Sequence, residues 1–210
     1  MAMTQAVTAS KPTVAGTTDA YGVEFNDQWL VADIPTGLEG ASAFTFALWF
    51  QRLSAWPDTI PPIFQITVDA GSTTSGAGLS YGGGSKDEIQ FTETGGLSPG
   101  DSNYAYVDAS VAPIGTWVHL AGVWASESQQ IFVNGVASGV TASRTASIAA
   151  DLSTYRVSIG AARDGSRPVH MLASNLQIWN VALTAQQIQD WSMKRIETPF
   201  QTGLIFYAPL

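Results

Sequence analysis

The segment Trp117–Trp124 constrains the fold more than any other part of the chain. It reads WVHLAGVW, and its two sets of alternating side chains are both mostly apolar. Successive side chains of a strand point to opposite faces, so this strand has two faces to bury. Such a strand is typical of the inside of a β-sandwich, where Gly122 would let a facing sheet approach beside the bulky Trp124.

The next apolar segment ends in the strongest turn signal of the sequence. Ile131–Val133 leads into Asn134-Gly135, and Val136 continues on the far side. Both turn residues tolerate the positive φ that two-residue hairpin turns require. The pattern therefore predicts a β-hairpin at this point.

Short apolar segments separated by Gly, Pro, Asp and Ser recur along the rest of the chain. One helix is expected after Thr184, with Gln187 as its capping-box partner and with Ile188 and Trp191 facing the sandwich. The predicted fold is all-β, a two-sheet antiparallel jelly-roll sandwich with one short C-terminal helix. The other expected strands are Val23–Phe25, Trp29–Val31, Phe44–Phe50, Ile63–Val68, Ile89–Phe91, Tyr104–Val107, Tyr155–Ile159, Met171–Trp179 and Leu204–Tyr207.

Composition sets the domain organisation and argues against several kinds of partner. Residues 1–20 are polar and lack periodicity, so we expect an extended N-terminal arm, either ordered against a partner or a floppy leader, before one domain over 21–210. The net charge of −8 argues against nucleic acid and against an anionic membrane surface. The chain has no Cys, which excludes disulfides and thiol chemistry. No apolar run approaches membrane-spanning length, so no membrane insertion is expected.

Three segments, together covering residues 21–191, resemble the laminin G-like, pentraxin-like branch of the concanavalin A-like jelly-roll domains. GVEFNDQWLVADIP followed by FTFALWFQ is similar to the opening strands of that family. WVHLAGVWASESQQIFVNGV is similar to its Trp-x-His strand and to the later strand that ends in Val-Asn-Gly. SNLQIWNVALTAQQIQDW is similar to its aromatic-Asn-x-Ala-Leu turn and short helix. The resemblance implies the jelly-roll fold, and it implies that His119 is a structural histidine whose ring bonds a neighbouring loop.

The sequence does not carry the carboxylate pattern of the enzymes on this fold. Those that cleave β-glucans use Glu-x-Asp-x-x-Glu, because glycoside cleavage needs two carboxylates across the scissile bond. Here the nearest cluster is Asp87, Glu88 and Glu93, in which the two glutamates would point to opposite faces of one strand. We interpret it as a solvated hairpin and expect no enzymatic activity. Gly82–Lys86 lacks the Gly-Lys-Ser/Thr of a phosphate loop and is interpreted as a flexible loop.

The resemblance also implies the places where a calcium site would be found. One typical ligand is an Asp before the aromatic-Asn turn, where this chain has Ser174-Asn175. Further ligands follow the strand that GLIFYAPL resembles, and this chain ends at Leu210. A lone loop carboxylate is usually solvated, so we expect no cofactor and no metal. The weak calcium candidates are Asp27, Asp69 and Asp164.

Loop aromatics and planar polar groups are the candidates for sugar binding. Sugars stack their apolar faces on aromatic rings and bond their hydroxyls to polar side chains. The glycan-binding candidates are Trp56, Tyr81, Asn103, Tyr104 and Arg163, with Tyr106 beside them. The alternative interpretation of Tyr104 and Tyr106 is that both are ordinary sheet residues.

Two functions are consistent with these features. The first is a non-enzymatic structural or display protein on a virion surface, such as a capsid decoration or tail subunit that contacts host glycans. It would assemble as an oligomer or on a larger particle, with protein partners held through the N-terminal arm and the C-terminal strand. The alternative is a glycan-binding or adhesion module excised from a larger extracellular or cell-surface protein, which the incomplete motif at GLIFYAPL favours.

Overall fold

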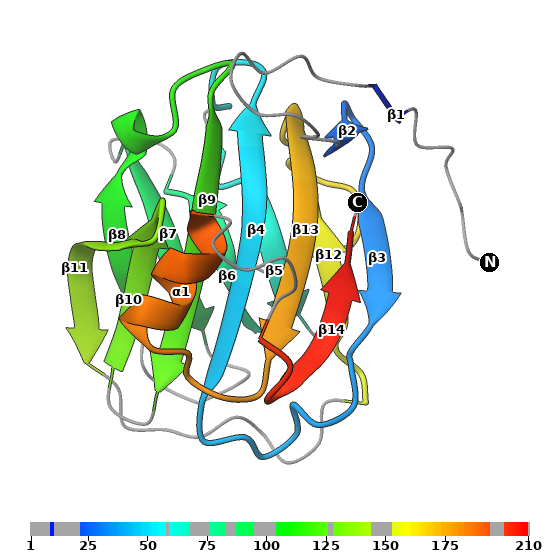
Figure 1. The fold of residues 1–210 in the computed structure, drawn as a ribbon. Helices are drawn as coiled ribbons and strands as arrows, with labels where there is room; N and C mark the ends of the chain where they lie inside the picture. The colour runs from blue at the N-terminus through cyan, green and yellow to red at the C-terminus, as the bar shows by residue number, and fades with distance from the viewer. Residues whose placement is uncertain are drawn as a thin grey trace.

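The computed structural model describes residues 9–10, 22–57, 59–67, 76–82, 87–94, 104–125, 128–143, 153–193 and 200–209. Over these residues it confirms a jelly-roll sandwich of two antiparallel sheets with one α-helix (Figure 1). Sheet A has the order β1 (Ala9–Ser10), β2 (Gly22–Phe25), β13 (Met171–Trp179), β4 (Phe44–Arg52), β9 (Trp117–Ala125), β10 (Ser128–Val133) and β11 (Val136–Ser143), with β14 (Leu204–Ala208) also paired to β13. Sheet B has the order β8 (Tyr104–Asp108), β7 (Glu88–Thr94), β6 (Gly76–Tyr81), β5 (Pro62–Thr67), β12 (Arg156–Ile159) and β3 (Leu30–Asp33). A short 3₁₀ turn, η1 (Ala109–Val111), follows β8.

The core lies between the two sheets and is built from alternate residues of each strand. On β4 the inward side chains are Phe44, Phe46, Leu48 and Phe50, all fully buried. The ring of Phe46 lies 4.8 Å from that of Phe64 on β5, so it bridges the two sheets. A Cβ on Gly122 would overlap the ring of Phe46 on the paired strand β4 and would lie 3.1 Å from the ring of Phe91 in sheet B, so this glycine makes room for rings of both sheets.

The hairpin predicted at Asn134-Gly135 is confirmed. Val133 pairs with Val136, and the two turn residues have φ values of 50° and 80°. The turn is also tied to β9, because the N–H of Asn134 donates to the carbonyl of His119 at 2.8 Å. In return the N–H of His119 donates to Oδ1 of Asn134 at 2.9 Å. The asparagine thus fixes both the turn and the neighbouring strand.

The helix α1 (Ala185–Ser192) lies on the outer face of sheet A, in front of β9 and β10 (Figure 1). The predicted capping box between Thr184 and Gln187 is present. Ile188 is 1% exposed and packs onto the sheet as predicted, while Trp191 is half-buried. An apolar cluster separate from the core forms under the helix; it consists of Ala47, Ala121, Phe132, Trp179, Leu183 and Ile188.

Both ends of the chain reach strand edges of sheet A. Within the predicted arm, Ala9 and Ser10 pair with Val23 and Gly22, which makes β1 a neighbour of β2. The predicted C-terminal strand is confirmed as β14, which pairs with the second half of β13. The remaining residues of the arm lie outside the described part of the chain.

Besides the two-residue β1, the strand β6 escaped prediction, and its composition explains why. β6 reads GAGLSY, and its glycines carry no β signal. Gly78 lies directly against the backbone of Phe64 and Gln65, where any side chain would overlap the carbonyl of Phe64. Close strand approach, rather than propensity, therefore places this segment in the sheet. Among the described residues, no helix is long and apolar enough to span a membrane.

Candidate functional site

Two of the predicted glycan-binding residues meet at one end of the sandwich. Trp56 lies in the loop after β4, and Tyr81 is the last residue of β6. Their rings are stacked with centroids 4.7 Å apart and planes 4° apart. Below them the ring of Phe50 lies 5.9 Å from Trp56 at 15°, which joins the pair to the core. Both upper rings are half-buried and therefore keep part of their surface in contact with solvent.

Two charged side chains complete this group, which we call the rim stack: Arg52, Trp56, Tyr81 and Asp87. The guanidinium carbon of Arg52 lies 5.0 Å from the centre of the Trp56 ring, a cation–π distance. The hydroxyl of Tyr81 donates to Oδ1 of Asp87 at 3.2 Å. Burial lowers the pKa of Arg52, and the negative potential of Asp87 and Tyr81 opposes that shift. Arginine stays charged despite such a shift, because its ordinary pKa is far above neutral.

Main-chain hydrogen bonds hold the strands and loops beneath the rim stack. The N–H of Tyr81 donates to the carbonyl of Pro61 at 3.0 Å, and that of Gly82 donates to the carbonyl of Glu88 at 2.7 Å. The carbonyl of Arg52 accepts from the N–H of Gly115 at 2.8 Å. The rings are thus positioned before any ligand arrives, which lowers the entropic cost of binding.

The rim stack also contains buried polar atoms that the protein leaves unpaired. Nε1 of Trp56 and Nε of Arg52 are both inaccessible to solvent and have no hydrogen-bond partner. An unpaired buried donor costs about 1–3 kcal/mol. Sequence reasoning missed Arg52; it interpreted Asp87 as solvated, and Asp87 is exposed while its carboxylate also accepts from Tyr81. A signal was present in the sequence, because Arg52 and Phe50 occupy alternate positions of one strand and so point to the same side of it. The ring of Trp56 packs on that side, against Phe50.

Tyr104 and Tyr106 lie elsewhere, on the outer face of sheet B. They occupy alternate positions of β8, with ring centroids 5.8 Å apart at 50°. Both are half-buried sheet residues, consistent with the alternative interpretation of these tyrosines. The same face carries buried polar residues on the neighbouring strands, namely Thr67, Ser80, Gln90 and Ser158. Asn103 lies outside the described residues.

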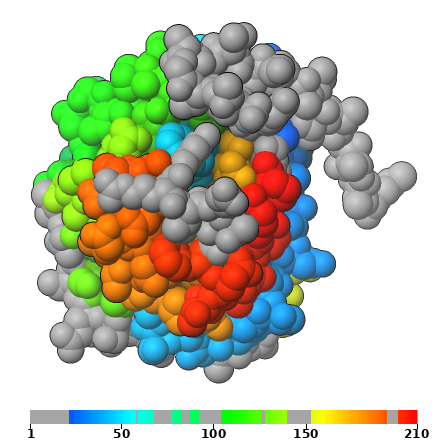
Figure 2. Space-filling view, viewed as in Figure 1, coloured from blue at the N-terminus to red at the C-terminus, as the bar shows by residue number. Residues whose placement is uncertain are grey.

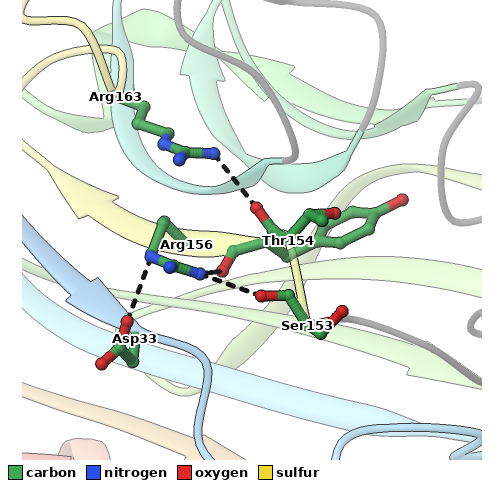
Figure 3. A network of polar contacts seen from close by, with 6 residues as sticks. Asp33, Ser153, Thr154, Arg156 and Arg163 are labelled. Carbon is green, nitrogen blue, oxygen red and sulfur yellow. Dashed lines mark hydrogen bonds and ion pairs between the residues drawn. The ribbon is translucent and has the colours of Figure 1, made fainter.

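Arg163 belongs to a polar network beside β12 and the edge strand β3 of sheet B (Figure 3). Its guanidinium donates to the carbonyl of Thr154 at 3.1 Å. Beside it, Nε of Arg156 lies 3.0 Å from Oδ1 of Asp33, across the antiparallel pairing of β12 with β3. Arg156 also donates to the carbonyls of Ser153 and Tyr155. The structure therefore places Arg163 in a separate network from the Trp56–Tyr81 pair.

The calcium candidates do not form a cluster in the described part of the chain. No group of three His, Asp or Glu side chains there could hold a metal ion. Asp27 is exposed and has a φ of 53°. Oδ1 of Asp164 accepts from the N–H of Ser166 at 2.9 Å, and this hydrogen bonding lowers the pKa of Asp164. Asp69 lies outside the described residues.

The expectation for the ring of His119 is corrected by the structure. The residue is fully buried on β9, and both ring nitrogens lack a hydrogen-bond partner. Its ring instead meets that of Trp49 edge-on at 5.3 Å. The main chain of His119, and not its ring, forms the hydrogen bonds that hold the neighbouring turn at Asn134. His119 is therefore a structural residue through its backbone.

Comparison with known domains shows to which family the chain belongs. The family model of the concanavalin A-like lectin/glucanases superfamily matches residues 24–189, which is most of the chain. The protein therefore belongs to this superfamily. Comparison of the sequence with curated proteins gives no match.

Solved structures share the fold at low sequence identity. Domain 4 of an extracellular arabinanase from Geobacillus stearothermophilus, in complex with arabinotriose, has a TM-score of 0.63 at 18% identity, over 90% of this chain and 82% of that one. A heptameric pentraxin from Limulus polyphemus has a TM-score of 0.56 at 15% identity, over 81% of this chain and 80% of that one. A proposed carbohydrate binding protein from Bacteroides ovatus has a TM-score of 0.62 at 18% identity, over 95% of this chain and 57% of that one. At these identities the likeness shows the fold alone.

Proposed function

We propose that this protein is a non-catalytic glycan-binding module and that the rim stack is its sugar-binding surface. The observation that carries the proposal is the parallel, stacked pair of Trp56 and Tyr81, half-buried at the end of the sandwich. Two of the structures that share the fold are described as carbohydrate-bound or as a proposed carbohydrate-binding protein, which supports the same class of ligand.

The chemistry of the rim stack suits a sugar ring. The apolar face of a pyranose or furanose packs on aromatic carbon, and its hydroxyls need planar donors and acceptors at the edge. Arg52 provides donors next to Trp56, and the carboxylate of Asp87 provides acceptors next to Tyr81. Because Asp87 also holds the Tyr81 hydroxyl, the ring and its polar edge are oriented together.

The test is a glycan array followed by calorimetry on the best ligand. Tyr81→Ala removes one ring of the pair, and we expect it to weaken binding about tenfold or more, since a stacked aromatic contact contributes on the order of 1 kcal/mol beyond the area it buries. Trp56→Ala should have a similar effect. Tyr104→Ala is the matched control, because it removes a half-buried tyrosine from the outer face of sheet B. A blank array would contradict glycan binding, and loss of binding in Tyr104→Ala alone would move the site to sheet B.

We further propose that the module is carried on the surface of a virus particle, attached through residues 1–20 and β14. The pairing of β1 with β2 supports this, because it brings the arm to the edge of sheet A, where a neighbouring subunit could contact it. Light scattering should then detect a symmetric oligomer that dissociates when residues 1–20 are removed. A full-length monomer would favour the alternative, a module of a larger extracellular or cell-surface protein.

A further inference from the structure

A second polar and aromatic group lies on the outer face of sheet A, whereas Arg52 of the rim stack has the inward parity of Phe50 on the same strand β4. Figure 2 shows atoms of β4 (cyan) and β13 (gold) at the bottom of a hollow between α1 (orange) and β14 (red). The residues that face outward there are Trp49 of β4, Ser174 and Asn175 of β13, and Tyr207 of β14. We call this group the outer hollow. Trp49 and Asn175 are half-buried, and Tyr207 is 44% exposed.

A β-bulge shapes the outer hollow. Ser174 pairs with Trp49, but the next paired residue of β13 is Gln177, opposite Ala47, so β13 has one residue more than β4 between these pairs. Asn175 lies in that bulge with a φ of 52°, a left-handed conformation that is uncommon in any residue other than glycine. Bulges of this kind redirect side chains and are frequent beside binding sites. Here the bulge brings Asn175 next to Ser174 and Tyr207.

Hydrogen bonds connect these three side chains and leave capacity for a ligand. Nδ2 of Asn175 donates to Oγ of Ser174 at 3.0 Å, and the hydroxyl of Tyr207 donates to Oδ1 of Asn175 at 2.9 Å. A carboxamide has two donors and two acceptor lone pairs. Asn175 therefore retains one donor and one lone pair, and the phenol oxygen of Tyr207 retains its acceptor sites.

Two buried polar side chains with unpaired atoms flank the same part of the sheet. His119 lies beside Trp49 on β9, and Gln177 lies opposite Tyr207 on β13. Both are fully buried, and neither ring nitrogen of His119 nor either amide atom of Gln177 has a partner. Burial lowers the pKa of His119 to about 3, so its ring is neutral near pH 7. These two buried side chains add no charge beside Trp49 and Tyr207, which suits a hydrogen-bonding ligand that is itself uncharged.

We infer that the outer hollow is a second binding site, for one residue of an uncharged sugar that stacks on Trp49 and hydrogen-bonds with Asn175 and Tyr207. The inference rests on the proposed function for its ligand class, but it uses none of the residues of the rim stack. The two sites differ in charge, because the rim stack contains Arg52 and Asp87. The outer hollow should therefore bind neutral oligosaccharides with little dependence on salt.

The experiment is an NMR titration of the full chain, observed at the indole N–H signals of its seven tryptophans. The ligands are arabinotriose, cellotriose and maltotriose, with trigalacturonate as the charged comparison. Trp49→Phe and Trp56→Phe assign the two signals that matter. We expect at least one neutral trisaccharide to shift the Trp49 signal, and we expect trigalacturonate to leave it unchanged.

Two conservative variants connect the shift to the outer hollow. Tyr207→Phe removes only an exposed hydroxyl, and Asn175→Gly keeps a residue that tolerates positive φ, so both should fold. Each should weaken the binding reported by Trp49 about fivefold to tenfold. Tyr81→Ala should leave it unchanged. A shift at Trp49 that persists in both variants would overturn the inference.

The outcomes separate this inference from the proposed function. If the neutral sugars shift the Trp56 signal and not the Trp49 signal, the outer hollow is not a binding site and the proposed site at the rim stack is supported. If they shift the Trp49 signal alone, the binding site at the outer hollow is supported and the proposed site at the rim stack is contradicted. If neither signal moves with any of the four ligands, both sites fail as glycan-binding sites.

Discussion

The two outer faces of the sandwich differ in what their sequences put there. On sheet A the outward residues near α1 are apolar and form a cluster under the helix that includes Ala47, Ala121 and Trp179. On sheet B the outward residues are mainly polar, and Ser80, Gln90 and Ser158 are typical of them. The inward faces of both sheets contribute apolar residues to one core. The difference between the outer faces therefore decides which sheet the chain covers with a helix.

Small residues make the cover on sheet A possible. Ala47 and Ala121 are paired neighbours on β4 and β9, and their small side chains leave space above the sheet for Ile188 of α1. Thr45 then fixes the approach to the helix, since its hydroxyl donates to the carbonyl of Val181 and accepts from the N–H of Leu183, both at 2.9 Å. Beyond the helix the alternating residues become Trp49 and His119, and the face is hollow in Figure 2.

The largest expected difference between the faces is the cost of removing an aromatic side chain. Trp179 is fully buried in the cluster under α1, and its Nε1 donates to the carbonyl of Phe200 at 2.7 Å. Trp179→Ala should lower the free energy of unfolding by about 3–5 kcal/mol. Tyr106→Ala, on the outer face of sheet B, should cost only about 1 kcal/mol because the ring is half-buried. Urea unfolding followed by circular dichroism measures both, and equal losses would contradict the comparison.

A smaller effect is expected from acid, and it concerns the buried histidine of sheet A. The pKa of His119 falls from 6.5 to about 3 on folding, because burial disfavours its charged form. Below pH 6.5 the unfolded chain binds a proton that the folded chain does not, so stability decreases as the pH falls from 6.5 towards 3. At pH 5 this loss is about 2 kcal/mol relative to pH 8.

The measurement is the free energy of unfolding at pH 8 and pH 5 in wild type and two variants. His119→Phe keeps a ring against Trp49 and removes the titrating group. The difference in the free energy of unfolding between pH 8 and pH 5 should therefore be smaller than in wild type by about 2 kcal/mol. His170→Gln is the matched control at a half-buried histidine. An unchanged pH difference in His119→Phe would show that the ring is already solvated in the folded state.

Most of the fold was predictable because its strands alternate regularly. Trp117–Trp124 and Asn134-Gly135 combine a strong apolar pattern with a turn that only a few residues allow, and both were predicted correctly. β6 was missed because its position depends on close approach to β5 at Gly78, a tertiary property that a local pattern does not contain. The arm strand β1 is two residues long and has no periodicity to detect.

The candidate sites were less predictable, because each joins residues from separate strands. Trp56 and Tyr81 were named as candidates from their loop positions, but their stacking depends on β4 and β6 ending at the same end of the sandwich. In the outer hollow, Ser174-Asn175 was noted only as a departure from a calcium ligand. In the structure these residues lie at a β-bulge, and Asn175 hydrogen-bonds with Tyr207 of β14. Neither the bulge nor the pairing with β14 is visible in a local sequence pattern.

The smallest effect in the comparison concerns exposed polar contacts on the two sheets. Thr184 caps α1 over sheet A, and Thr184→Ala should cost about 1 kcal/mol because it leaves a helix N–H without its partner. Asp33 pairs with Arg156 at the edge of sheet B, but its side chain is 89% exposed. Asp33→Ala should therefore cost less than about 0.5 kcal/mol, since solvent screens exposed ion pairs. Thermal unfolding of both variants at low and high salt measures these two costs. If Asp33→Ala destabilises the protein as much as Thr184→Ala does, and this loss disappears at high salt, the ion pair between Asp33 and Arg156 contributes more stability than its exposure indicates.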